Sequence, residues 1–207
     1  MSWYWFFAWA FKSVMPFMAR VHVHGTENVP ESGPFILVSN HESVLDPLMI
    51  QSGCPRVIHT FTKSSQFKGR VWRWVLPRVR AFPVRRYQVD PQAVRIALRR
   101  LGAGEAVGVF PEGERAWDGV LQPFRRGTVR LLLRTGVPII PAWISGSYDV
   151  WPRWSRRVRR GEVHIRFGEP LELGVHDSRP KRDAALDGAE ARLRTALLTL
   201  ADRNAHE

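Results

Sequence analysis

The chain has 207 residues, of which 44% are hydrophobic, and it carries a net charge of +12. This length suits one domain, which is large enough to bury a sizeable core. The single cysteine, Cys54, excludes an internal disulfide and fits a reducing compartment, and the excess of basic residues predicts a partner of opposite sign. Nucleic acid, anionic lipid headgroups and an acidic protein all meet that condition.

The first 19 residues are crowded with aromatic side chains, which favour the interface between membrane and water. The apolar stretch from Trp3 to Met18 is broken by Lys12 and Ser13, and it is shorter than the roughly 20 apolar residues of a spanning helix. It also lacks the basic start and the cleavage site of a secretory signal. We therefore expect residues 1–19 to be an interfacial or re-entrant membrane anchor, with a helix packed on the domain as the alternative.

Residues 20–207 are expected to form the second part of the chain, a single domain. The alternation in residues 20–25 predicts a strand and a turn, with His22 and His24 on the same face. Two such histidines are compatible with a metal site, but no third ligand is evident nearby. We expect a half-buried strand here, and no metal is implied anywhere in the chain.

Apolar runs and helical spacings alternate through the rest of the sequence. The runs predict strands at residues 34–39, 56–61, 82–84, 106–110, 137–144 and 162–167. The spacings predict helices from Pro47 onward and over residues 67–80, 91–101, 127–135 and 179–203, with Pro77 interrupting the second. Such alternation predicts an α/β fold, in which a mixed, partly parallel sheet is flanked by helices.

A histidine and an aspartate follow the strand predicted at residues 34–39, in the sequence Asn40-His41-Glu42-Ser43-Val44-Leu45-Asp46. On a regular helix, five steps would leave His41 and Asp46 about 140° apart. The pair can meet if His41 lies in the loop before a helix and Asp46 in its first turns. A carboxylate that fixes the tautomer would make this histidine a general base, although such a spacing also arises by chance.

A second polar segment, Phe110-Pro111-Glu112-Gly113-Glu114-Arg115, also follows a predicted strand, so both segments are expected at one edge of the sheet. Gly113 permits a sharp turn, and Arg115 can bind a phosphate or carboxylate with two donors. Glu112 can accept hydrogen bonds from a hydroxylated substrate. The alternative is a surface turn with a solvated ion pair.

The combination of these segments resembles the glycerolipid acyltransferase family, which includes bacterial 1-acyl-sn-glycerol-3-phosphate acyltransferases. Asn40, His41 and Asp46 match its Asn-His-x(4)-Asp block, and residues 110–113 with Arg115 match its Phe-Pro-Glu-Gly-x-Arg block. Lys63 with residues 82–86, and residues 137–141, resemble the two remaining blocks. The blocks occur in the order of the family and span residues 40 to 141.

The resemblance implies that His41 deprotonates an acceptor hydroxyl while Asp46 orients it. The hydroxyl then attacks the thioester of acyl-CoA or acyl carrier protein directly, and the reaction needs no cofactor. The sequence agrees in having no Gly-x-Ser-x-Gly nucleophile segment. The family's pattern also assigns residues to the glycerol-phosphate end of the acceptor: Glu112, Gly113, Arg115, Lys63 and Arg86.

Two points of this assignment stay open at the level of sequence. Arg85 is adjacent to Arg86 and is the alternative phosphate ligand. Glu114 stands where the family commonly has threonine or serine, and a carboxylate there would repel a phosphate unless it points away or pairs with an arginine. The departure leaves the identity of the acceptor open, between lysophosphatidic acid and another lysophospholipid or a lipid amino acid.

Basic residues alternate with tryptophan in two segments, residues 68–80 and 151–160. This mixture suits an anionic membrane surface, and it also suits an acidic carrier protein. No nucleic-acid motif accompanies it, so no nucleic-acid partner is expected. The sequence therefore predicts a membrane-associated acyltransferase at the cytoplasmic face of the cell membrane, which makes phosphatidic acid from lysophosphatidic acid. The rivals are a basic membrane-binding protein without catalysis and an enzyme that hydrolyses thioesters.

Overall fold

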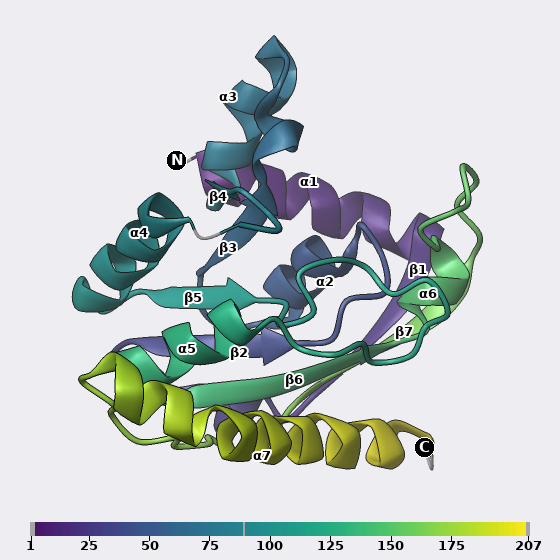
Figure 1. Ribbon diagram of the computed structural model, residues 1–207. Coiled ribbons are helices and arrows are strands. Elements are labelled where there is room, and N and C mark those ends of the chain that lie inside the picture. Colours follow the sequence, from purple (N-terminus) through teal and green to yellow (C-terminus); the bar gives the residue numbers. More distant parts are fainter. Residues whose placement is uncertain (1–2, 89, 206–207) are drawn as a thin grey trace.

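The computed structural model describes residues 3–88 and 90–205, with side chains placed up to Arg203. Within these residues one sheet of seven strands has the order β1-β7-β6-β2-β5-β3-β4 (Figure 1). The strands are β1 (Ala19–His24), β2 (Phe35–Ser39), β3 (Ile58–Lys63), β4 (Ala81–Val84), β5 (Ala106–Val109), β6 (Ile139–Ser145) and β7 (Gly161–Phe167). Each lies within two residues of a predicted strand, and the expected α/β fold is confirmed.

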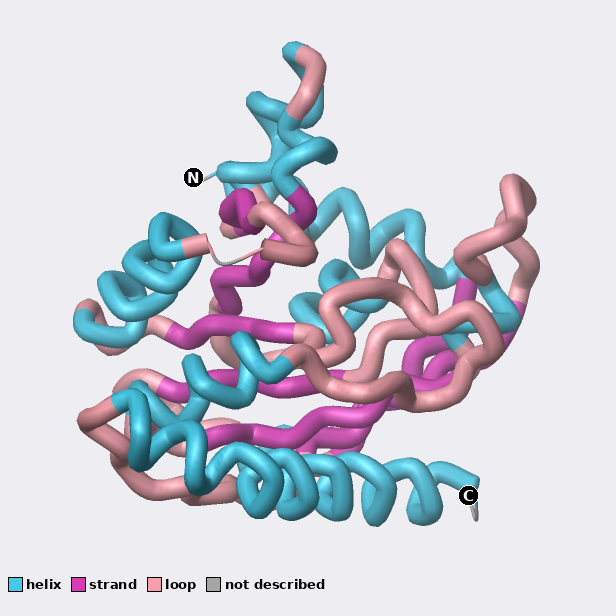
Figure 2. The backbone as a smooth tube through the Cα atoms, in the orientation of Figure 1, coloured by secondary structure: helices cyan, strands magenta, loops and turns pink. Residues whose placement is uncertain are grey.

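Five neighbouring strands, from β6 through β2, β5 and β3 to β4, run parallel to one another. β7 is antiparallel to β6 and parallel to the edge strand β1, so the sheet is mixed, as the sequence predicted. Val38 on β2 lies opposite both Val109 on β5 and Pro141 on β6. The polar segments that follow β2 and β5 therefore leave the sheet side by side, and Figure 2 shows loops gathered beyond these strand ends.

Helices cover both faces of the sheet. Their bounds are α1 (Trp3–Met18), α2 (Asp46–Gly53), α3 (Arg70–Arg78), α4 (Pro91–Gly102), α5 (Arg126–Thr135), α6 (Ser147–Val150) and α7 (Arg179–Ala205), with short 3-10 helices η1 (Thr26–Asn28) and η2 (Ser64–Phe67). Side chains from α4, α5 and α7 join one hydrophobic core, and side chains from α1, α2 and α6 join the other. Residues of β2 contribute alternately to the two cores, because successive side chains of a strand point to opposite faces of the sheet.

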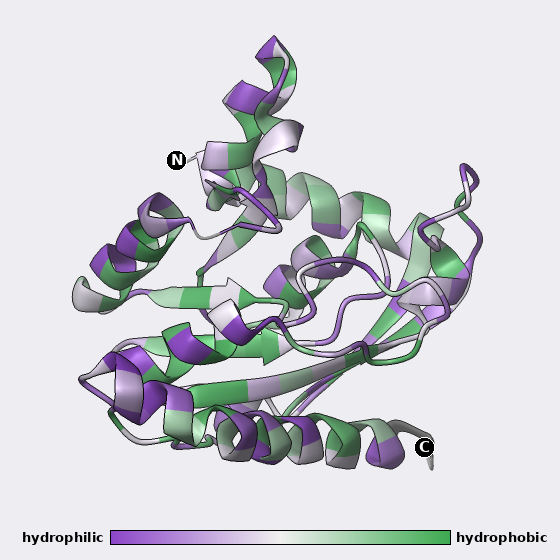
Figure 3. Cartoon of the chain, viewed as in Figure 1, coloured by the Kyte–Doolittle hydropathy of each residue, from purple (hydrophilic) through white to green (hydrophobic). Residues whose placement is uncertain are grey.

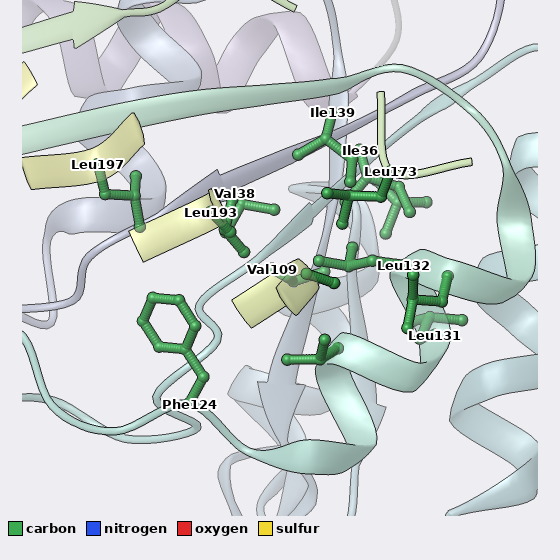
Figure 4. Packing of buried hydrophobic residues seen from close by; sticks show 14 of the residues in the cluster. Ile36, Val38, Val109, Phe124, Leu131, Leu132, Ile139, Leu173, Leu193 and Leu197 are labelled. Carbon is green, nitrogen blue, oxygen red and sulfur yellow. The ribbon is translucent and has the colours of Figure 1, made fainter. Parts of the chain in front are cut away.

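The core beneath α5 and α7 is the larger one. Ile36 and Val38 from β2 meet Leu132 from α5 and Leu193 from α7 there (Figure 4). The helical spacing of apolar residues in the last helix places five of them on one face, and all five are buried: Leu186, Ala189, Leu193, Leu197 and Leu200. Figure 3 shows the resulting stripes along α7, whereas β2 and β5 are largely hydrophobic because both of their faces are covered.

The N-terminal aromatic stretch forms α1, which continues through Lys12 and Ser13 and contains Pro16. Tyr4 and Met15 are buried, and the helix lies against β1, α2 and α3. Helix α3 ends one residue after Pro77, which accounts for the predicted interruption. Among the described residues, no helix combines the length and the apolar character needed to cross a membrane.

Candidate active site

His41 lies in the loop after β2, and Asp46 is the first residue of α2. The imidazole Nδ1 and the carboxylate Oδ2 are 2.8 Å apart. This is the arrangement that the five-residue spacing required. It forms because the chain leaves β2, turns within residues 40–45, and begins α2 with Pro47 close to its start, where the missing amide proton costs nothing.

The Asp46 carboxylate is wholly buried and organises its own loop. Its Oδ2 also accepts hydrogen bonds from the backbone amides of Glu42 (2.6 Å) and Ser43 (2.8 Å). One carboxylate oxygen thus fixes both the imidazole and the loop that carries it. A histidine held in this way has little freedom to leave the orientation that the reaction needs.

His41 is prepared to accept a proton at neutral pH. Burial lowers the pKa of its imidazole below the ordinary value of 6.5; the hydrogen bond and the charge of Asp46 oppose this shift, and the charges of Arg86 and Arg115 add to it. Because Nδ1 faces a carboxylate, the neutral ring carries its proton on Nδ1 and offers the lone pair of Nε2. The ring stacks on Phe110, with their centroids 4.1 Å apart.

Glu112 connects the two polar segments through buried hydrogen bonds. It is 2% exposed, and its two carboxylate oxygens accept hydrogen bonds from the backbone amides of His41 (2.8 Å) and Gln122 (2.9 Å). Burial raises the pKa of this carboxyl to about 7, and the two amide bonds act against that rise. The structure thus gives Glu112 a task in holding the His41 loop, while its contact with a substrate stays a prediction.

Asn40 and Glu42 form a buried polar network that sequence reasoning missed. The side-chain amide of Asn40 donates to the carbonyl of Ile144 on β6 and accepts from its N–H, both at 2.8 Å. The Asn40 amide also donates to Glu42 (3.0 Å), whose burial raises its pKa to about 8. The sequence signal that could have indicated this network is the asparagine at the end of a strand, because an asparagine side chain often hydrogen-bonds to backbone groups in place of another backbone group.

Gly113 makes the turn of the second segment, with a φ of +77°. A side chain there would be strained by this backbone and would place its Cβ 3.0 Å from Cγ of Arg125. The turn ends in Arg115, whose pKa is lowered by burial and by the charge of Arg153. Gly113 and Arg115 therefore lie where the sequence placed them, on the loop after β5 beside His41.

The remaining predicted phosphate ligands come at the end of β3 or after β4, at the same edge of the sheet. Arg86 follows β4; its charge lowers the pKa of His41, and the charge of Arg115 in turn lowers the pKa of Arg86. Arg85 faces Asp90 instead, through an ion pair of 3.5 Å and a backbone hydrogen bond of 2.8 Å. Of the two adjacent arginines, Arg86 is the one near the histidine. Lys63 is exposed at the end of β3, two strands away from β2.

Glu114 pairs with two arginines, which is one of the two conditions that the sequence set for a carboxylate at this place. Its oxygens lie 2.9 Å from Arg153 and 3.1 Å from Arg125. Neither arginine is connected with the site by its place in the sequence. Arg153 belongs to the basic segment of residues 151–160, and only the tertiary structure brings it to the loop after β5.

His22 receives two neighbours that are remote in sequence. Parallel pairing of β1 with β7 places Glu162 and His164 beside it, with their ligand atoms within 4.8 Å of one another. The rings of His22 and His164 are stacked, with their centroids 4.7 Å apart and an angle of 16° between the ring planes. The tertiary structure thus brings to His22 the further ligand types that were not evident in the sequence, and Nε2 of His22 lies 3.9 Å from Oε2 of Glu162.

An apolar pocket lies next to the histidine loop. It is lined by Leu37, Pro47, Ile50, Ile58, Thr60, Gly108, Val109 and Phe110. Pro47 and Phe110 connect it to the His41–Asp46 pair, because Phe110 stacks on the imidazole. The site thus combines a buried base, a group of arginines and an adjacent apolar surface, which together are suited to acyl transfer onto an anionic acceptor.

Comparison with known proteins agrees with this chemistry. The family described as Acyltransferase matches residues 20–145, so the chain belongs to the acyltransferase family. It is 28% identical to 1-acyl-sn-glycerol-3-phosphate acyltransferase of Bacillus subtilis, over 91% of this chain and 92% of that protein. It is 31% identical to the chloroplastic enzyme BAT2 of Brassica napus, over 79% of this chain and 48% of that protein.

The human 1-acyl-sn-glycerol-3-phosphate acyltransferase alpha is 31% identical over 73% of this chain and 55% of its own length. The chain thus spans about half the length of the plant and human relatives. A crystal structure of the 1-acyl-sn-glycerophosphate acyltransferase PlsC from Thermotoga maritima superimposes with a TM-score of 0.69 and 25% identity. The match covers 89% of this chain and 75% of that one.

Proposed function

We propose that this protein transfers a fatty acyl chain from a thioester to the free hydroxyl of 1-acyl-sn-glycerol-3-phosphate, which yields phosphatidic acid for phospholipid synthesis. The observation that carries the proposal is the buried His41–Asp46 pair, 2.8 Å apart, with arginine charges close to the imidazole. The names of the relatives support the same acceptor.

The reaction follows from the geometry of His41. Nε2 takes the proton of the acceptor hydroxyl while the hydroxyl oxygen forms a bond to the carbonyl carbon of the thioester. The tetrahedral intermediate then collapses, the carbon–sulfur bond breaks, and the imidazolium returns the proton to the leaving thiolate. Asp46 stabilises the imidazolium during this sequence and stays ionised. Arg115 and Arg86 hold the phosphate, so that the hydroxyl is presented to the base.

The acyl donor in this proposal is acyl-CoA or acyl carrier protein, and no cofactor takes part. The apolar cavity beside Pro47 and Phe110 has a volume of only about 10 Å³, which is room for about one water, so it is not the groove that takes the acyl chain.

We further propose that the protein binds the cytoplasmic face of the membrane through an aromatic surface on α1 and α3, with residues 1–19 as the anchoring segment. This aromatic surface consists of the exposed side chains Trp3, Trp5, Trp9, Phe17, Val71, Trp72 and Trp74. The two helices are joined by the contact of Trp3 with Trp74, at 5.1 Å. Exposed Arg70 and Arg73 on α3 add the positive charge that anionic headgroups attract.

The experiment that tests the reaction is acyl transfer from labelled palmitoyl-CoA to lysophosphatidic acid in liposomes. We expect labelled phosphatidic acid with the wild type and a loss of about 10²–10⁴-fold with His41→Ala, the contribution of a general base. His22→Ala is the matched control, because it removes an exposed histidine from β1 and leaves the site intact.

Other results would identify a rival. Product with a different lysolipid in an acceptor panel would change the acceptor and keep the chemistry. Free fatty acid released without any acceptor would indicate hydrolysis. Absence of every product, with acyl carrier protein also tested as donor, would leave a membrane-binding protein without catalysis.

A further inference from the structure

Glu114 connects three segments at the mouth of the site. Its Oε2 accepts hydrogen bonds from Arg153 (2.9 Å) and from the Tyr87 hydroxyl (3.1 Å), and its Oε1 accepts one from Arg125 (3.1 Å). The hydrogen bond from Arg153 is the largest cause that holds the pKa of this carboxyl below its usual value. Glu114 is therefore a fixed anion that orients two arginines.

Arg153 is held in one orientation by contacts on one side of its guanidinium. Nη1 donates both to Glu114 and to the carbonyl of Arg115 (3.1 Å), and Cζ lies 4.0 Å from the ring centroid of Trp117. Every hydrogen bond of Arg153 with the described residues leaves from Nη1. The Nε and Nη2 donors thus form a free edge, which has the spacing that binds two oxygens of a phosphate.

The electrostatics of this cluster favour an anionic ligand. Arg86, Arg115 and Arg153 lie close enough that the charges of Arg115 and Arg153 lower the pKa of Arg86, in addition to the larger effect of its burial. Side chains of Arg153 and Glu114 are only about a quarter exposed, at 25% and 26%, so water screens them incompletely. Glu114 pairs directly with Arg125 and Arg153, and its charge also acts on Arg86, so one carboxylate faces three arginines in this cluster.

We propose that Arg153 is a third phosphate-binding arginine of the acceptor site, and that Glu114 is the positioning residue that holds it there. This inference rests on the proposed function and deepens it. It gives a physical reason for the carboxylate in a position where the family resemblance leads one to expect threonine or serine: the charge orients Arg153 and does not meet the phosphate.

The first test is kinetic. Arg153→Ala should raise KM for lysophosphatidic acid about 10-fold or more, the value of one charge-assisted hydrogen bond, with little change in kcat. Arg153→Lys should give an intermediate KM, because lysine keeps the charge and loses the two-donor edge. A monoacylglycerol acceptor, which has no phosphate, should be used equally by all three proteins. Arg156→Ala, an exposed arginine of the same segment, is the matched control.

The role of Glu114 is tested by a double-mutant cycle. Glu114→Ala should raise KM for lysophosphatidic acid, and it should add nothing in the Arg153→Ala background, because it acts through that arginine. A lower KM in Glu114→Ala would mean that the carboxylate competes with the phosphate and would overturn the proposal. Equal losses with phosphorylated and unphosphorylated acceptors would also overturn it.

A binding measurement separates this inference from the proposed reaction. Octyl phosphate, a soluble phosphomonoester, is titrated calorimetrically into the wild type and the Arg153 and Arg156 variants. Binding weakened about 10-fold by Arg153→Ala alone supports the site even if the wild type makes no phosphatidic acid. Equal binding by all variants refutes the role of Arg153, and thermal melting of each variant shows that its fold is intact.

Discussion

At the scale of single residues, His41 depends on a balance between burial and its partner. Burial lowers the pKa of the imidazole, and Asp46 opposes the shift by a hydrogen bond and a charge. The base must be unprotonated to accept the hydroxyl proton, so activity is retained above the pKa of His41 in the folded protein and is lost as pH falls through it. The acid limb of kcat/KM is therefore expected below pH 6.5, the ordinary value for histidine.

Asp46→Asn should separate the two effects of this carboxylate. Without its charge, the pKa of His41 falls further, so the acid limb of kcat/KM moves to lower pH. The plateau rate falls by about 10²–10⁴-fold because the imidazolium is no longer stabilised. A pH profile of kcat/KM for wild type and variant measures both. A limb that moves to higher pH would contradict the assigned role of Asp46.

At the scale of elements, the site is made by loops that leave neighbouring parallel strands. Buried hydrogen bonds connect these loops to one another. Glu112 links the loop after β5 to the backbone of His41, and the carbonyl of His41 accepts from the amide of Ala116 at 2.7 Å. Asn40 links the loop after β2 to β6. These buried bonds replace the sheet ladder where the strands diverge, and this keeps His41 in place.

Glu112→Gln, an isosteric change, tests the hydrogen bonds by which Glu112 holds the two loops together. Glutamine has only one acceptor oxygen, so one of the two backbone amides loses its partner and faces an NH₂ group. The free energy of unfolding should fall by about 1–3 kcal/mol, the cost of a buried unpaired donor, and kcat should fall as well. Denaturant titration and turnover check the two effects. The exposed Glu172→Gln is the control, and unchanged stability in Glu112→Gln would show that these hydrogen bonds are unimportant.

At the scale of the whole molecule, five parallel strands end at one edge of the sheet, so residues from 40 to 153 along the chain meet in one site. The aromatic surface on α1 and α3 is a second feature of this scale, because it is composed of segments that are about 60 residues apart. Figure 1 shows α3 projecting from the domain next to α1. A protein that binds a bilayer through these helices would bring its acceptor site close to the lipid.

The double variant Trp5→Ser/Trp9→Ser should test membrane binding without touching the site. Both side chains are exposed, at 59% and 65%, so their loss costs little stability. Transfer of each large apolar side chain is worth about 1.5–3 kcal/mol, so partitioning into anionic vesicles should fall about 100-fold or more. Vesicle sedimentation measures it, with the exposed Leu198→Ser on α7 as control. Unchanged sedimentation would refute the aromatic surface as the membrane contact.

Local patterns in the sequence determined the helices, the strands and the positions of His41 and Asp46. The spacing of apolar residues located the seven strands and the apolar face of α7, because the repeat of apolar positions along the chain reports which face of an element is buried. Spacing placed His41 before a helix and Asp46 at its start, because a loop and a first turn are local structures. Family order pointed to Gly113, Arg115 and Arg86 on loops that the fold then gathered at one edge.

Only the tertiary structure decided which distant groups meet. Arg153 follows β6 and its sequence neighbours are those of a basic surface, yet it contacts Arg115 and Glu114, which follow β5, because β6 and β5 lie on the two sides of β2. Contacts between segments also decide three other features of the site. Arg85 pairs with Asp90 and Arg86 does not, Glu112 accepts from the backbone of His41, and Asn40 bonds to the backbone of Ile144. Such contacts are set by strand order and burial, and neither can be read from the residues adjacent to them in the chain.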